Sequence, residues 1–323
     1  QSEPRPAISH ESARRGTTPH TYSVLMWLAL RERETEIMTD AATRYTLTLS
    51  CADRVGIAAA INMFLAEQHS AVLGASYYVD ESQRRFFARQ EIVPSPSFTL
   101  DAFRQRFAPI ARDFQMEWTA SEQRQKKRVV ILVSKFGHCL HDLFERWQAG
   151  ELPADIPCVI SNHEAQREFV ERHGVPFHHV PIDADNKHAA YEHIGRLFDD
   201  ARGDVMVLAR FMQVLPEPLC TAYPGRIINI HHSFLPSFAG ARPYHQAHQR
   251  GVKLVGATSH YVTPALDQGP IIEQDVIRVS HADSADRIVQ LGRDIEKSVL
   301  ARSLLYHLED RVLIHGNHTV VFR

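Results

Sequence analysis

The residues best suited to chemistry lie in one short polar segment, Asn229-Ile230-His231-His232, at the end of an apolar run. In a strand, Asn229 and His231 point to the same face because side chains alternate. An amide N–H can stabilise a developing oxyanion, and an imidazole can donate or move a proton near neutral pH. The alternative is that both side chains only cap the end of a strand. The segment therefore predicts either an acid–base site or a polar strand end.

Asp267 is a second candidate, because a carboxylate beside an imidazole holds its tautomer and can orient a water molecule. It lies in the turn-forming sequence Asp267-Gln268-Gly269, so an ordinary turn aspartate is the alternative. Asp267 has a chemical role only if the fold brings it to His231. The sequence contains no Gly-x-Gly-x-x-Gly, Walker or His-Glu-x-x-His motif, so we expect no metal and no cofactor.

The composition limits the class of protein. The 323 residues carry a formal net charge of -2, which argues against non-specific binding to nucleic acid. No apolar stretch approaches the roughly 20 residues of a membrane helix. The four cysteines are widely spaced, as expected for single buried thiols in a reducing cytosol. We therefore expect a cytoplasmic protein with neither nucleic acid nor membrane as partner.

The pattern of apolar residues divides the chain into four parts. Residues 1–40 are taken as an extension, disordered or non-native, and are excluded from the fold. Residues 41–120 follow the order strand, helix, strand, strand, helix. A polar linker is expected at 121–127. Strands alternate with helices in 128–323, which predicts a mostly parallel sheet with crossover helices.

These elements must position the polar segment at one edge of the sheet. Ligands in open α/β sheets bind beyond the carboxyl ends of the strands, where Asn229 and His231 are expected. The pattern predicts strands at 129–133, 158–160, 177–182, 204–209 and 227–230, an antiparallel pair at 254–262 and 270–279, and helices at 57–69, 100–114, 139–148, 164–173, 187–201 and 284–308.

Several motifs, in this order, resemble the formyltransferase family. They are Asn229-Ile230-His231, Leu235-Pro236-Ser237-Phe238, Gly256-Ala257-Thr258, His260-Tyr261-Val262 and Leu266-Asp267-x-Gly269-Pro270-Ile271-Ile272. The family includes enzymes that formylate glycinamide ribonucleotide or methionyl-tRNA, and formyltetrahydrofolate deformylases. The resemblance implies a catalytic trio of Asn229, His231 and Asp267.

Further segments are most similar to the deformylases, among them Ser134-Lys135-Phe136-Gly137-His138 and His232 in place of a proline. The resemblance implies hydrolysis of 10-formyltetrahydrofolate to tetrahydrofolate and formate, which supplies formate for purine synthesis and balances one-carbon folate pools. The implied substrate-binding residues are Leu208, Arg210, Met212, Leu215, His232, Ser233 and His260. Two alternatives are a folate-dependent formyltransferase acting on an amine such as glycinamide ribonucleotide, and a non-catalytic, amino-acid-responsive binding protein.

The N-terminal part resembles an ACT domain, a βαββαβ module that binds small amino acids. The resemblance implies methionine or glycine as effector, a homo-oligomer, and a regulatory site at Asp53, Val55, Gly56, Ile57 and Asn62. A generic ferredoxin-like dimerisation domain is the alternative. The fold class expected overall is α/β: a ferredoxin-like βαββαβ domain, followed by a Rossmann-like, mostly parallel formyltransferase domain.

Overall fold

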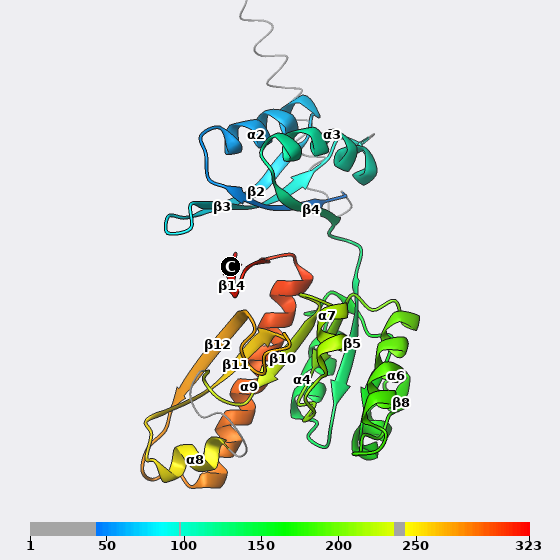
Figure 1. Cartoon of the computed structure of the whole chain (residues 1–323), viewed down its shortest axis with the longest axis vertical. Coiled ribbons are helices and arrows are strands. Elements are labelled where there is room, and N and C mark those ends of the chain that lie inside the picture. The colour runs from blue at the N-terminus through cyan, green and yellow to red at the C-terminus, as the bar shows by residue number, and fades with distance from the viewer. Residues whose placement is uncertain (1–42, 97, 236–242) are drawn as a thin grey trace, which may run out of the picture. The chain divides into compact units, whose positions relative to one another are not determined.

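The computed structural model describes residues 43–96, 98–235 and 243–323 (Figure 1). The expectations for residues 1–40, and for the Pro236-Ser237-Phe238 part of the loop motif, lie outside these residues. All elements discussed below belong to the unit Arg44–Arg323.

The N-terminal part is a four-stranded antiparallel sheet with two helices, in the strand order β2-β3-β1-β4. The rings of Phe64, Phe103 and Phe107 belong to its apolar core. This arrangement confirms the expected βαββαβ fold. The elements are β1 (Tyr45–Ala52), α2 (Ile57–Glu67), β2 (Ala71–Asp80), β3 (Arg85–Val93), α3 (Leu100–Asp113) and β4 (Glu117–Glu122).

The last strand, β4, was not apparent in the sequence pattern. Its sequence Glu-Trp-Thr-Ala-Ser-Glu is mostly polar, and it becomes a strand through its antiparallel pairing with β1. Because β4 ends at Glu122 and the next strand begins at Lys127, the connection between them is shorter than the expected linker at 121–127.

The C-terminal part contains the expected mostly parallel sheet, in the order β12-β11-β10-β9-β5-β7-β8. The five strands from β10 to β8 run parallel, whereas β11 and β12 are antiparallel to their neighbours. A two-residue strand, β6 (Ala154–Asp155), pairs with β5. The strands are β5 (Lys127–Val133), β7 (Val159–Ser161), β8 (Phe177–His179), β9 (Val205–Leu208), β10 (Ile227–His231), β11 (Leu254–Tyr261) and β12 (Ile271–Arg278).

Helices cover both faces of this sheet (Figure 1). One face packs against α4 (His138–Gln148), α5 (Arg167–Arg172) and α9 (Ala285–Leu308). The other packs against α6 (Lys187–Asp200) and α7 (Glu217–Ala222). Residues 129–133 of β5 are at most 1% exposed, as expected for a strand covered on both faces.

Four short elements depart from the expected pattern. The helix expected at 164–173 begins as a 3₁₀ turn, Glu164–Gln166, before α5. The helix α8 (Pro243–Gln249) and the hairpin of β13 (Val312–His315) and β14 (His318–Val321) were not expected. Short elements carry too few periods of apolar residues to be recognised.

Two findings bear on the expected compartment. All four cysteines are buried and unpaired, and burial raises the pKa of the Cys158 thiol to about 11. Within the described ranges, no helix has both the length and the apolar character needed to cross a membrane. A cytoplasmic location stays a prediction.

Candidate active site

The polar segment is the carboxyl end of a central strand. β10 lies between β9 and β11, and Asn229 is opposite Leu208 on one side and His260 on the other. Ile228 and Ile230 point to the opposite face and pack into the core beneath α9. Core packing of the isoleucines therefore fixes which face Asn229 and His231 occupy.

Asp267 reaches the same place from the loop between β11 and β12. Its Oδ1 lies 3.3 Å from Nδ1 of His231 and 3.7 Å from Nε2 of His260. The loop depends on Gly269, because a Cβ there would lie 1.8 Å from the carbonyl oxygen of Tyr261. Asp267 itself has a positive φ of 55°, a conformation that aspartate tolerates better than most residues. The structure thus brings all three residues of the proposed trio together.

The charges of the trio follow from these contacts. The contact with His231, and then the contact with His260, hold the pKa of Asp267 well below its usual range, so its carboxylate is ionised at neutral pH. Nδ1 of His231 is the atom facing Asp267, and its Nε2 is buried without a hydrogen-bond partner among the described residues. An unpaired buried nitrogen is costly unless a ligand uses it. His231 is therefore arranged to act through Nε2.

His260 orients the amide of Asn229. A carbonyl oxygen can only accept, so Nδ1 of His260 donates to the oxygen of Tyr261 at 2.9 Å. In the tautomer that carries its proton on Nδ1, Nε2 of His260 accepts from Nδ2 of Asn229 at 3.2 Å. The same amide nitrogen carries a second N–H, which can donate to a ligand in the cavity.

The trio lines a cavity of about 230 Å³. The cavity is also lined by six of the seven expected substrate-binding residues: Leu208, Arg210, Met212, Leu215, His232 and His260. Ser233 is not in the lining. It is 4% exposed, and its carbonyl oxygen accepts a hydrogen bond from Thr258.

Two buried hydroxyls that the sequence did not single out for a role support this cavity. The Ser134 hydroxyl accepts from the backbone N–H of Met212 at 3.0 Å and donates to Asn162 at 2.7 Å. The Thr258 hydroxyl accepts from the backbone N–H of Leu235 and donates to the Ser233 carbonyl. They fix the loops after β9 and β10. Ser134 and Thr258 both belong to quoted motifs, but no spacing in the sequence indicates either contact.

One group of potential metal ligands occurs in the part of the chain that the structure describes: His138, Cys139 and Glu296, with donor atoms within 4.8 Å of one another. Glu296 already accepts hydrogen bonds from His138 at 2.7 Å and from Tyr244 at 2.8 Å. Burial raises the pKa of Cys139 well above its ordinary value, which keeps it a neutral thiol. These contacts fit a hydrogen-bonded network rather than a metal centre.

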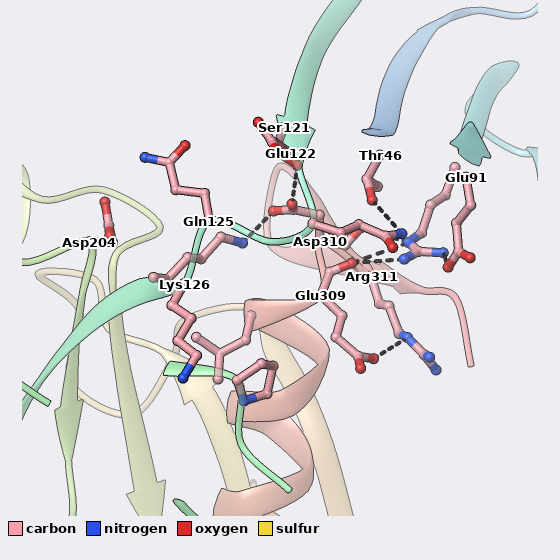
Figure 2. A pocket seen from close by; sticks show the side chains of 15 residues that line it. Thr46, Glu91, Ser121, Glu122, Gln125, Lys126, Asp204, Glu309, Asp310 and Arg311 are labelled. Atoms are coloured by element: carbon pink, nitrogen blue, oxygen red, sulfur yellow. Dashed lines mark hydrogen bonds and ion pairs between the residues drawn. The ribbon is translucent and has the colours of Figure 1, made fainter. Parts of the chain in front are cut away.

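A second, more polar pocket of about 400 Å³ contains none of the trio (Figure 2). Asp310 accepts from the Ser121 hydroxyl at 2.6 Å and forms an ion pair with Lys127. The Arg89 guanidinium donates to the carbonyl oxygen of Glu309 at 2.9 Å. Asp310 and Arg89 thus have partners within the protein, so a structural role explains their presence in this pocket.

The expected regulatory residues lie around the start of α2. Gly56 takes a φ of 98° as its N-terminal cap, Val55 is exposed, and Ile57 is buried in the core. The backbone N–H of Asp53 donates to Arg84. Asn62 lies one turn further along the helix, where its Oδ1 accepts from Gln90 at 3.1 Å. The side chain of Ile57 thus packs in the core, whereas Asn62 belongs to a polar cluster with Gln90 and Tyr77.

Comparison with known proteins places these features in a family. Residues 127–304 match the formyl transferase family. The chain is 48% identical to a formyltetrahydrofolate deformylase of Bacillus subtilis, over 85% of this chain and 93% of that protein. It is 45% identical to a formyltetrahydrofolate deformylase of a Corynebacterium species, over 87% of this chain and 98% of that protein.

Solved structures give the same result. A formyltetrahydrofolate deformylase from Pseudomonas syringae pv. tomato superposes with a TM-score of 0.86 at 51% identity, over 92% of this chain and 100% of that chain. Glycinamide ribonucleotide transformylase 1 from Symbiobacterium toebii gives a TM-score of 0.60 at 29% identity, over 62% of this chain and 97% of that chain. The chain therefore belongs to the formyltetrahydrofolate deformylase family.

Proposed function

We propose that this chain hydrolyses 10-formyltetrahydrofolate to tetrahydrofolate and formate, and that Asn229, His231 and Asp267 carry out the reaction. The observation that carries the proposal is the meeting of three groups in one cavity: an ionised carboxylate, an amide, and an imidazole whose buried nitrogen has no partner among the described residues. Family membership over most of the chain supports the same reaction.

In the proposed reaction, water attacks the formyl carbon and its oxygen forms the new C–O bond. The carbonyl oxygen becomes an oxyanion, which accepts hydrogen bonds from Nδ2 of Asn229 and from Nε2–H of protonated His231. Asp267 orients the water and accepts its proton. The C–N10 bond then breaks as N10 takes the proton that Asp267 accepted, and the resulting formic acid ionises. The products are a secondary amine and formate, with net release of one proton at neutral pH.

The experiment that tests the proposal is formate release without an amine acceptor. Wild-type protein should release one formate for each tetrahydrofolate formed. Asp283→Asn is a matched control, because Asp283 is a hydrogen-bonded aspartate in an exposed turn. Formation of tetrahydrofolate only when glycinamide ribonucleotide is added would refute hydrolysis and favour a transferase.

The physiological role follows from the products. We propose that the chain works in the cytoplasm, where it supplies formate for purine synthesis and balances one-carbon folate pools. Deletion of its gene should raise the ratio of 10-formyltetrahydrofolate to tetrahydrofolate in cells. An unchanged ratio would contradict this role.

We further propose that residues 41–120 form an ACT domain that binds methionine or glycine, joined to the catalytic domain of residues 128–323. Gln90 is 1% exposed, and its Oε1 has no hydrogen-bond partner among the described residues. Its Nε2 is close to both Asn62 and the Tyr77 hydroxyl. Such an acceptor suits the ammonium group of an amino acid.

Calorimetry on the full chain with each amino acid tests this effector site. Gln90→Leu should abolish the heat of binding, whereas Asp283→Asn should not change it. Absence of heat with both amino acids in the wild type would remove the proposed sensing role.

We also propose a homo-oligomer that uses β2. This ten-residue strand is at the edge of its sheet, and Val72, Leu73, Tyr77, Tyr78 and Val79 on it are each 38–47% exposed. An exposed, apolar edge strand is prone to pair with a second strand. Light scattering should give more than one copy for the wild type and a smaller assembly for Val79→Lys. Leu254→Lys, which changes an exposed apolar residue of β11, is the matched control.

A further inference from the structure

Arg210 occupies an unusual position just beyond the end of β9. Its φ is 64°, which is the left-handed region that non-glycine residues rarely adopt. It lines the same cavity as Asn229, His231 and Asp267, yet its side chain is only 10% exposed. Backbone strain of this kind is retained where the surrounding structure holds it, often at sites of function.

A buried carboxylate holds the Arg210 guanidinium from behind. Glu296 on α9 is 1% exposed, and its Oε2 lies 3.4 Å from Nε of Arg210. Although burial raises the pKa of Glu296, the hydrogen bond from His138 and the charge of Arg210 lower it below its usual value. Glu296 is therefore ionised, and Tyr244 completes its hydrogen bonding.

The contact with Glu296 does not supply hydrogen-bond acceptors for all the N–H groups of the Arg210 guanidinium. Nε and Nη1 of Arg210 are both buried and have no hydrogen-bond acceptor among the described residues. His232 is a neighbour in the cavity, and burial followed by the charge of Arg210 lowers its pKa to about 4. It is neutral at pH 7, so the positive charge on this side of the cavity comes from Arg210. A buried cationic donor without an acceptor is costly, which points to an anion that is absent from the structure.

We propose that Arg210 binds the carboxylate of formate, with Nη1 donating to one formate oxygen, and that Glu296 positions the guanidinium for this contact. The inference rests on the proposed hydrolysis, because formate is the anion that this reaction generates beside the trio. Arg210 then stabilises the product whose negative charge appears as the C–N10 bond breaks.

Neutralisation of Glu296 alone is a weaker explanation for Arg210. Glu296 has hydrogen bonds from His138 and Tyr244, whereas its contact with Nε of Arg210 does not meet hydrogen-bond geometry. A side chain present only to pair with Glu296 would have no reason to leave Nη1 buried without an acceptor among the described residues.

The test is the affinity for formate in wild type, Arg210→Gln and Arg210→Lys. Binding is measured by line broadening of ¹³C-formate with tetrahydrofolate present, and independently as product inhibition by formate. Arg302→Gln is the matched control, because Arg302 is ion-paired with Asp275 away from the cavity. We expect Arg210→Gln to weaken formate binding about tenfold to a hundredfold, as for a lost charged hydrogen bond. The formate affinity of Arg210→Lys should lie between those of the wild type and Arg210→Gln.

A double variant, Arg210→Gln with Glu296→Gln, covers the case in which Arg210→Gln alone fails to fold. It removes both charges at once, and Glu296→Gln keeps the size of its side chain, so the double variant separates formate binding from the neutralisation of Glu296. Unchanged formate affinity in a folded Arg210→Gln or double variant would overturn the proposal. Formate binding by a wild type that releases none would instead refute the proposed hydrolysis and leave the anion site standing.

Discussion

Replacing Asp267 by asparagine removes one negative charge from the trio and almost no volume. Its Oδ1 is 3.3 Å from Nδ1 of His231, and its side chain is 24% exposed. At that distance two unit charges attract by about 5 kcal/mol at an effective dielectric constant of about 20. Partial exposure and the remaining amide contact reduce the loss to about 3–4 kcal/mol, or roughly 100- to 1,000-fold in kcat.

The assay is the rate of formate release by Asp267→Asn with saturating 10-formyltetrahydrofolate. The effect should fall on kcat and leave KM within about threefold, because the carboxylate orients protonated His231 toward the oxyanion, which is present only in the transition state. Asp283→Asn should retain wild-type kcat. If Asp267→Asn kept more than a tenth of wild-type kcat, the carboxylate would not be orienting the imidazole during catalysis.

Three more changes test other parts of the site. Asn229→Ala should lower kcat by about 100- to 1,000-fold, as for one lost oxyanion donor, and a loss below tenfold would contradict that role. Gly269→Ala should lower both kcat and thermal stability, because its Cβ would collide with the Tyr261 carbonyl, so unchanged kinetics would show that the loop does not place Asp267. Burial, then the charge of Lys127, lowers the pKa of His307 to about 3, so the folded protein should lose stability as pH falls from 6.5. Between pH 6.5 and 5, denaturant titrations should show that the free energy of unfolding falls by about 2 kcal/mol less in His307→Gln than in the wild type. An equal fall in both proteins would contradict the burial of a neutral His307.

The sequence predicted the central strands well for a physical reason. Strands covered on both faces, such as β5 and β9, are continuous apolar runs and are easy to recognise. The side-chain alternation of β10 then placed Asn229 and His231 on one face, as observed.

Features set by distant pairing could not be predicted in this way. β4 has few apolar residues and is a strand because β1 pairs with it. Ser134 supports the loop of Met212, 78 residues away, and Arg210 meets Glu296 only because β9 and α9 pack in one domain. The spacing of residue types along the chain does not predict such contacts.

The meeting of Asp267 with His231 lies between these two cases. Spacing alone allowed an ordinary turn aspartate, and only the resemblance to a family implied a trio. The structure supplies the physical cause: antiparallel pairing of β11 with β10, and the close approach that Gly269 permits at the turn.

Hydrolysis by the trio is tested most directly by a single-turnover reaction of wild-type protein in H₂¹⁸O with no amine present. We expect formate that carries one solvent oxygen per tetrahydrofolate formed, at a rate that falls at least a hundredfold in Asp267→Asn. Formate without solvent oxygen, or no formate until an amine is added, would contradict hydrolysis by the trio.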